Sequence, residues 1–493
     1  METLKYFLLS ILLLPNLTVG QVSQEWINIY GSASTNYIDE VKDIAADNNG
    51  NVYITGKSLS TTSNTTDVLI IKYDGQGNQV WLKEHHAFGI DKGKCIGVDK
   101  ANNIYVAGIS ENTNGDEDAL LLKYNTNGNL IWSRTFDVAG MNEEIRGMKI
   151  DKNANIYLTG FTEEINLYTN MLTLKYDSVG TLNWSAIYND PIGGHDHAYA
   201  IALGNNGDVF VTGESVKVIA PEDVALTTIK YDANGNQVWE HNFQGVANDY
   251  DYSRAIIVDS LGYAYVGGGT VQATFPTDVD FLTIKYDLNG DTIWTRTYSG
   301  LTASGNDGIV DIELDENLSI IVSGNSDGAN SQDIATIQYD NNGNINWVVR
   351  EDTGQYTDIV ADIEIDDSNK IYIASAYLIK YDEFGNEIWR ILMDTTSLYP
   401  NPTCLTLSED ACNLYLGADG MFQLPNTLWT ADAVAIKYKQ CTPSPTVEVS
   451  PIHTSSNLLQ IVDILGRETI PQKNVPLFYR YDDGRVEKKL IME

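Results

Sequence analysis

Residues 72–81 read KYDGQGNQVW, and residues 230–239 read KYDANGNQVW. Each stretch follows an apolar run and contains a turn from Asp74 to Asn78, or from Asp232 to Asn236, with Trp three residues beyond it. In such a turn Gly supplies the positive φ, and the Asp side chain bonds its own backbone. The D-x-N-G-N spacing superficially resembles a calcium loop, but no Glu follows at the distance where that loop needs a bidentate ligand. The stretch therefore predicts a hairpin with Trp on its second strand.

Tryptophan recurs at a nearly constant interval along the chain. Neighbouring members of the series are 55, 51, 52, 55, 55, 53 and 42 residues apart, which indicates a repeated structural unit. The series consists of Trp26, Trp81, Trp132, Trp184, Trp239, Trp294, Trp347 and Trp389. The KYD motif or its equivalent also occurs eight times, and a hairpin such as DIAADNNGNVYITG at 43–56 precedes it.

Each unit thus holds four short runs that are rich in β-branched and aromatic residues and bounded by Asn, Gly and Asp. Such runs predict one four-stranded antiparallel sheet per unit, and the absence of a 3.6-residue period argues against a helical solenoid. We therefore predict an all-β, eight-bladed β-propeller. Seven blades are the alternative, because the unit around residues 371–382 is short. The eight Trp side chains are expected to pack between adjacent blades.

The two ends of the repeat series complement each other. Trp26 lies on a strand with no preceding hairpin, whereas residues 435–439, AIKYK, have no Trp after them at the expected spacing. The N-terminal strand is therefore predicted to complete the C-terminal blade and close the ring, which leaves no unpaired sheet edge.

The composition indicates a folded, strongly acidic protein. Hydrophobic residues make up 43% of the 493 residues and charged residues 20%, which argues against disorder. Lys and Arg number 31 against 67 Asp and Glu, so the formal charge is −36. Nucleic acid and anionic lipid should be repelled, and cations are the more plausible small partners.

The N-terminus predicts export. Residues 1–20 contain a Lys, an apolar run from Tyr6 to Leu14 and a small-residue end, as in a secretory signal sequence. The run is well short of the roughly 20 residues that a membrane span needs. We expect the propeller at 21–441, a Pro- and Ser-rich linker at 442–456 and a small C-terminal β segment at 457–493. A disulfide among Cys404, Cys412 and Cys441 is plausible outside the cell, with its connectivity open.

These motifs carry a family resemblance. The D-x-x-G-N-x-Y-x-T-G hairpin and the K-Y-D-x-x-G-N-x-x-W stretch resemble the bacterial secreted β-propeller repeat families, which implies the fold but no particular activity. In the tail, VDILGR at 462–467, the run from Phe478 to Tyr481, DDGR at 482–485 and the terminal KKLIME are similar to the C-terminal sorting domain of Bacteroidetes type IX secretion. That resemblance implies transfer by this machinery to the cell surface or the medium.

A second resemblance concerns enzymes. The D-x-x-G-x-x-x-W turn is also similar to the quinoprotein dehydrogenases, which implies a shared architecture; the adjacent cysteine pair of many members is missing here. No G-x-S-x-G, H-E-x-x-H, Walker or G-x-G-x-x-G motif stands in a strand-to-helix context. We therefore assign no catalytic residue and expect a protein that is not an enzyme.

Two sets of acidic residues recur on what should be one face of the ring. The first set lies eight residues before the Asp of each hairpin, or its equivalent: Asp39, Asp91, Glu143, Asp196, Asp251, Asp307 and Asp358. The second set lies five residues before the Lys of each KYD, or its equivalent: Asp67, Asp118, Asp280, Asp333 and Asp432. These carboxylates could bind calcium or a basic partner. Alternatively, they cap backbone NH groups, which their repetition in almost every blade favours.

The combined hypothesis is a secreted or cell-surface propeller that acts as a binding, adhesion or scaffold module for an extracellular glycan or protein. The alternatives are an extracellular polysaccharide hydrolase or lyase and a structural component of a surface layer. No cofactor is certain, and calcium is the one that the acidic sets suggest.

Overall fold

The computed structural model describes most of the chain from residue 22 onward, in two compact units, residues 1–441 and 442–493. The described residues are 22–31, 38–59, 65–138, 140–164, 168–219, 222–247, 250–274, 277–301, 305–328, 331–352, 359–393, 399–423, 429–441, 458–462, 469–470, 476–481 and 486–490. The predicted signal sequence, the linker, Asp358 and most of VDILGR lie outside them. All named elements of the described chain are β-strands.

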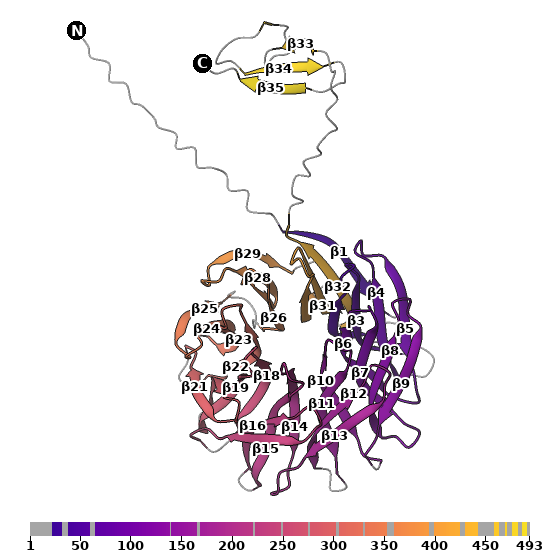
Figure 1. Ribbon diagram of the computed structural model, residues 1–493, viewed down its shortest axis with the longest axis vertical. Coiled ribbons are helices and arrows are strands. Elements are labelled where there is room, and N and C mark those ends of the chain that lie inside the picture. Colours follow the sequence, from indigo (N-terminus) through magenta and orange to yellow (C-terminus); the bar gives the residue numbers. More distant parts are fainter. Residues whose placement is uncertain are drawn as a thin grey trace, which may run out of the picture. The chain divides into compact units, whose positions relative to one another are not determined.

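The first unit contains eight four-stranded antiparallel sheets arranged around an axis, which confirms the eight-bladed propeller and excludes seven blades (Figure 1). The first, innermost strands are β2 (Glu40–Ala46), β6 (Asp91–Val98), β10 (Glu143–Ile150), β14 (Asp196–Leu203), β18 (Tyr252–Val258), β22 (Gly308–Leu314), β26 (Asp362–Ile365) and β30 (Tyr399–Leu407). The second strands are β3 (Val52–Leu59), β7 (Ile104–Glu111), β11 (Ile156–Glu163), β15 (Val209–Ile219), β19 (Ala264–Thr274), β23 (Ile320–Asp327), β27 (Ile371–Ala374) and β31 (Asn413–Gln423).

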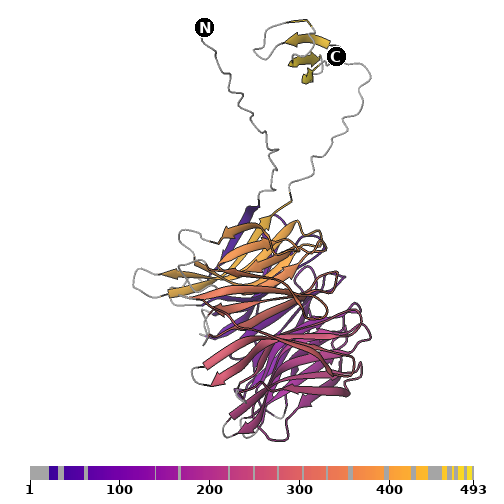
Figure 2. The same ribbon diagram turned by 90° about the vertical axis from the view of Figure 1, so that its left-hand side faces the viewer.

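The outer half of each blade carries the KYD and Trp motifs. The third strands are β4 (Thr66–Tyr73), β8 (Glu117–Tyr124), β12 (Thr169–Tyr176), β16 (Glu222–Tyr231), β20 (Thr277–Tyr286), β24 (Gln332–Tyr339), β28 (Tyr377–Tyr381) and β32 (Trp429–Lys439). The fourth strands, at the rim, are β5 (Gln79–His85), β9 (Leu130–Phe136), β13 (Leu182–Tyr188), β17 (Gln237–Phe243), β21 (Thr292–Tyr298), β25 (Ile345–Glu351), β29 (Glu387–Leu392) and β1 (Ser23–Tyr30). Figure 2 shows the sheets from the side, stacked one against the next.

The N-terminal strand closes the ring, as the repeat series predicts. β1 pairs antiparallel with β32, from Ser23 opposite Lys439 to Tyr30 opposite Ala433. The last blade therefore has the strand order β1-β32-β31-β30. The second unit contains one three-stranded antiparallel sheet of β33 (Leu458–Val462), β34 (Pro476–Tyr481) and β35 (Val486–Leu490), which agrees with the expected small β segment.

Seven of the eight Trp side chains lie against the Gly-bearing turn of the next blade, and Trp389 is the exception. Trp294 Nε1 donates a hydrogen bond to the Asn341 carbonyl oxygen (3.2 Å), at the second position of that turn. A Cβ atom added to Gly343, at the fourth position, would lie 2.9 Å from the indole ring, and Gly343 has a φ of +79°. Glycine is therefore required twice here, for the turn and for the close approach. The Trp26/Gly77, Trp81/Gly128, Trp132/Gly180, Trp184/Gly235, Trp239/Gly290 and Trp347/Gly385 pairs repeat this contact.

The Lys of the KYD motif reaches the same turn. Lys285 Nζ donates to the Asn341 carbonyl oxygen (3.2 Å) and lies 5.0 Å from the centroid of the Tyr265 ring. Its aliphatic stem is buried and its charge is held between an aromatic face and a backbone oxygen. The turn, the Lys and the Trp of one repeat motif thus form the contacts between two neighbouring blades.

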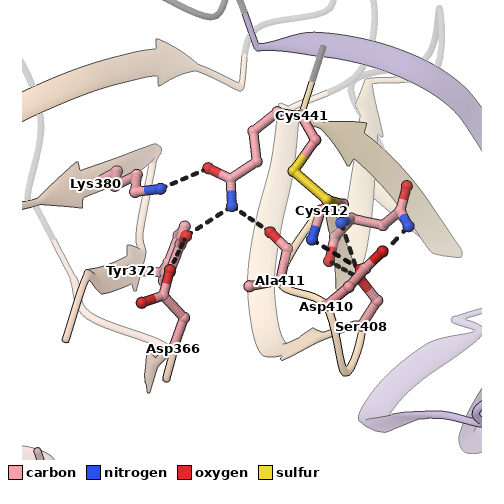
Figure 3. Close-up of a disulfide and its surroundings, with 10 residues drawn as sticks. Asp366, Tyr372, Lys380, Ser408, Asp410, Ala411, Cys412 and Cys441 are labelled. Atoms are coloured by element: carbon pink, nitrogen blue, oxygen red, sulfur yellow. Dashed lines mark hydrogen bonds between the residues drawn. A yellow bond between two sulfur atoms is a disulfide. The ribbon is translucent and has the colours of Figure 1, made fainter. Parts of the chain in front are cut away.

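The seventh blade has no such turn ahead of it, and Gln440 occupies its place beside Lys380 and Tyr372, which are labelled in Figure 3. Lys380 Nζ donates to Gln440 Oε1 (2.8 Å), and Gln440 Nε2 lies 2.6 Å from the Tyr372 hydroxyl oxygen. The next residue, Cys441, forms a disulfide with Cys412 in the turn between β30 and β31. Cys95 and Cys404 are free and buried, so the open connectivity is resolved to one pair.

Carboxylates tie several innermost strands together. Asp43 accepts from the backbone NH of Ile96 on the next blade (2.7 Å), and Asp362 accepts from that of Leu405 (2.7 Å). Asp362 also hydrogen-bonds to Asp311, so one of these two carboxyl groups is protonated. Burial raises the pKa of both, and burial together with the Asp311 charge raises the pKa of Glu364 to about 7.

Removing one interblade indole should lower the stability of the ring. Trp294→Ala is expected to reduce the free energy of unfolding by about 3–5 kcal/mol, because it leaves a cavity between two blades. Trp389→Ala is the matched control, since the equivalent turn is missing beyond the seventh blade and its ring contact is with Tyr372 in its own blade. Urea unfolding of both variants measures the difference, and equal losses would contradict the importance of the turn contact.

The acidic innermost strands should make stability fall as the pH rises. In the folded protein the pKa of Glu364 is about 7, against an ordinary value of 4.5. The folded state therefore holds this proton more tightly than the unfolded state, and the resulting stabilisation is fully present below pH 4.5 and is lost as the pH rises past 7. Glu364→Gln is expected to raise the free energy of unfolding by about 1–3 kcal/mol at pH 8 and to leave it unchanged near pH 4. Urea unfolding across this range measures it, with exposed Glu316→Gln as control; parallel pH profiles for wild type and Glu364→Gln would contradict the prediction.

Candidate functional site

The first acidic set holds the loops that connect the blades. Asp307 accepts from the backbone NH of Gly300 (2.7 Å), in the loop before it, and from that of Asp327 (2.7 Å), at the end of the second strand. Asp91 accepts in the same way from Ala87 (2.7 Å). The six described members of the set are at most 1% exposed, and they are Asp39, Asp91, Glu143, Asp196, Asp251 and Asp307. The structure thus assigns a capping role to carboxylates of this set, while a ligand at these positions stays a prediction.

The second set lies beside the first, across the boundary between blades. Ligand-capable atoms of Asp67, His86 and Asp91 all lie within 4.8 Å of one another, as do those of Asp118, Asp137 and Glu143. The electrostatic neighbours of Asp280 and Asp432 include Asp307 and Asp39, respectively, and burial is the main cause that raises the pKa of both. Asp333 instead pairs with Arg350 (2.8 Å).

The fourth blade has an equivalent acid that the spacing rule missed. Ala225 occupies the expected position, and Asp223, two residues earlier on the same face of β16, is the acid of this blade. Gln244 Nε2 donates to Asp223 Oδ2 (2.9 Å), and Asp223 is among the charges that raise the pKa of Asp251. The sequence did not indicate this residue because it lies two positions away from the spacing that the other blades share.

A different set of residues marks the axis of the ring. The innermost strands of seven blades have a bulge near their third residue, where one residue has no opposite partner on the second strand. The bulged residues are Lys42, Lys94, Arg146, Tyr199, Arg254, Val310 and Thr403. Four of the seven are basic in a chain whose formal charge is −36, so the bulged positions carry cations although other positions of the innermost strands are acidic.

Two cavities adjoin at these residues. One has a volume of about 480 Å³ and is lined by Arg146, Tyr199, Tyr252 and Arg254, with Asn306, Asn325 and Gln332 at its side. The other has a volume of about 470 Å³ and shares Arg146, Tyr199 and Arg254 with the first, while Lys42, Lys94 and Glu144 line the rest. We refer to Lys42, Lys94, Arg146, Tyr199, Tyr252 and Arg254 as the axial site.

Two guanidinium groups stack on one ring at the centre of the axial site. The Arg254 Cζ atom lies 4.2 Å from the centroid of the Tyr199 ring, and the Arg146 Cζ atom lies 4.6 Å from it. Arg146 Nη1 is buried and has no hydrogen-bond partner among the described residues. A guanidinium NH donor that is desolvated and unpaired is poised for an anion.

Acidic neighbours hold these side chains in place. Glu144 contacts Lys94 Nζ (3.2 Å) and Arg146 Nε (3.4 Å), and Glu214 accepts a hydrogen bond from the Tyr199 hydroxyl (2.6 Å). Burial and this bond raise the pKa of Tyr199, so its hydroxyl remains a neutral donor. Hydrogen bonds from His197, Tyr199 and Tyr250 outweigh burial and lower the pKa of Glu214. Glu144 thus orients Lys94 and Arg146. Because one carboxylate neutralises only one of these two positive charges, net positive charge remains for an anion.

Sequence reasoning missed the axial site, although a signal was present. Each bulged residue from Lys42 to Val310 follows a member of the first acidic set by three positions, and four of these six residues are Lys or Arg. A single basic residue on a strand is an ordinary surface feature, so this pattern becomes informative only when the ring brings the blades together.

Among the described residues, no helix is long and apolar enough to cross a membrane.

Comparisons with known proteins agree with this architecture. Residues 25–61 match the family model described as a beta-propeller repeat. The chain is 22% identical over 444 residues to an uncharacterized WD repeat-containing protein, L264, of Acanthamoeba polyphaga mimivirus; the match covers 64% of this chain and only 32% of that protein, so the chain spans about a third of its length.

Two solved propellers are similar in structure. The Dos1 propeller has a TM-score of 0.51 and 10% identity, with 85% of this chain and 96% of that chain covered. Sqt1 from Chaetomium thermophilum has a TM-score of 0.53 and 9% identity, with 86% and 100% covered. At such identities the similarity concerns the fold alone. This chain is an eight-bladed β-propeller that carries a recognisable β-propeller repeat.

Proposed function

We propose that this protein is an extracellular, non-catalytic binding propeller whose axial site holds an acidic polysaccharide. The observation that carries the proposal is the pair of guanidinium groups stacked on Tyr199, one of which has a buried NH donor without a partner. Arginine presents its NH donors as a planar fork that matches carboxylate and sulfate groups. An anionic group in the axial cavity would therefore satisfy the unpaired donor.

The other residues of the cavity favour a sugar as the carrier of that anion. Asn306, Asn325 and Gln332 line the side of the first cavity and can both donate to and accept from hydroxyl groups. Tyr252 adds aromatic surface and a hydroxyl group. A cationic centre with amide and aromatic walls is suited to a uronic acid or a sulfated sugar, and an adjoining cavity with two lysines would take the next charged residue of the chain.

The lining of the two cavities favours binding over glycoside hydrolysis. Hydrolases generally need two carboxyl groups flanking the bond, one as acid and one as base or nucleophile. Among the described residues, the axial cavities are lined by one carboxylate, Glu144, and two cations hold it in its ionised form. Glu144 is therefore placed to orient Lys94 and Arg146.

Export to the cell surface is part of the proposal. The signal-like residues 1–20, the resemblance of the tail to a type IX sorting domain and the disulfide between Cys412 and Cys441 support it, since structural disulfides persist in oxidising compartments. The type IX secretion machinery would then be a partner during export.

Binding should depend on the stacked arginines. Alginate and dextran sulfate serve as anionic probes, and neutral dextran serves as the uncharged reference. We expect Arg146→Ala and Arg254→Ala each to weaken binding of at least one anionic probe by about tenfold or more, the equivalent of about 1.4 kcal/mol, and to reduce its salt dependence. Calorimetric titration of the full chain measures both effects.

Lys152→Ala is the matched control, because it removes one exposed positive charge from the turn after β10, at the opposite end of the strand that carries Arg146. It should bind as the wild type does. Absence of binding to either anionic polymer, or equal losses in all three variants, would refute the axial site. Shortened polysaccharide after incubation would replace the binding proposal with the hydrolase or lyase alternative.

A further inference from the structure

One position in each blade sets the boundary between the second and third blades apart from most others. The residue directly after the fourth strand, five positions beyond Trp, faces the second acidic set. In three blades it is a hydrogen-bond donor: His86 lies 2.9 Å from Asp67, Gln244 donates to Asp223 (2.9 Å), and Ser299 bonds to Asp280. In the second blade the same position is Asp137, which cannot donate when ionised. The sixth blade also has an acid there, Asp352, but its second-set acid, Asp333, pairs with Arg350 (2.8 Å).

The substitution of a donor by an acid creates a cluster of three carboxylates. Asp118 is the second residue of β8, Asp137 follows β9 and Glu143 begins β10, and one carboxylate oxygen of each lies within 4.8 Å of the others. Asp118 is 8% exposed and Glu143 is fully buried. The neighbours that hold these buried acids by hydrogen bonds are uncharged: Asn112 Nδ2 donates to Asp118 Oδ1 (3.0 Å), Thr162 Oγ1 donates to Glu143 Oε1 (2.7 Å), and the Val138 backbone also bonds Glu143.

A buried oxygen in this cluster remains unsatisfied. Glu143 Oε2 has no hydrogen-bond partner among the described residues. A buried acceptor without a partner, next to two further carboxylates, is costly unless a cation occupies the space. The exposed Asp137 provides the route to solvent.

We propose that Asp118, Asp137 and Glu143 bind one calcium ion at the boundary between the second and third blades. Calcium takes oxygen ligands at about 2.3–2.6 Å, so ligands on opposite sides of the ion lie up to about 5 Å apart, as these oxygens do. It accepts carboxylates in irregular geometry and completes its shell with water, whereas magnesium requires a nearly ideal octahedron. This site is independent of the axial site and of its polysaccharide.

Calcium titration of the metal-free full chain by calorimetry tests the proposal. One ion per chain should bind, and saturating calcium should raise the melting temperature by several degrees. Asp137→Asn, which introduces the residue that the third blade has at this position, Asn189, should weaken calcium binding at least tenfold and abolish the calcium-dependent shift. Because Asp137 is exposed, this variant should fold, and its melting temperature with chelator verifies that.

Two further variants separate a defined site from general electrostatics. Asp116→Asn removes an equal charge near Asp118 without touching the cluster and should bind calcium as the wild type does. His86→Asp should create the same three-acid arrangement between the first and second blades, raising the number of bound ions to two. No calcium binding by the wild type, equal losses in the two Asn variants, or an unchanged ion number in His86→Asp would overturn the assignment.

Discussion

One backbone carbonyl in each D-x-x-G-N turn fixes a blade to the blade before it. At Asn341 this oxygen accepts from both Trp294 Nε1 and Lys285 Nζ, which come from two different strands of the preceding blade. A slip of either strand by one residue would turn its donor to the opposite face of the sheet. The contact therefore sets the register within one blade and the packing between two, and its repetition lets a ring form from units that share only a few residues.

The same contact explains how much of the molecule the sequence could predict. Tryptophan, KYD and the turn recur because seven of the eight boundaries are built from them, and this repetition allows the blade number and the closure to be predicted. The axial site is different, since Arg146 and Arg254 meet at Tyr199 only after blades three, four and five are placed around the axis. Asp223 was missed for another reason: it lies on the same face of its strand as the expected position but two residues earlier.

The distribution of charge follows from the different roles of the acidic and the basic side chains. Many acids of the chain serve the backbone; Asp307, for example, bridges a loop and a strand end, and Asp362 ties two innermost strands. Carboxylates used in this way contribute to the net charge of −36 but are not free to interact with a ligand. Positive side chains concentrated near the axis then lie within a negative ring, so a polyanion would be guided by their local field and repelled elsewhere.

Closure of the ring has a mechanical consequence. The chain leaves the last blade at the end of β32, which is held to β1 by a ladder of antiparallel hydrogen bonds that a pull on the tail could break one after another. The disulfide joins Cys441, just beyond β32, to Cys412 in the turn between β30 and β31. Tension arriving from the C-terminal side therefore passes covalently into the inner half of the blade and bypasses the β1–β32 ladder. A propeller tethered through its tail could thus bear load from a bound polymer while its ring stays closed.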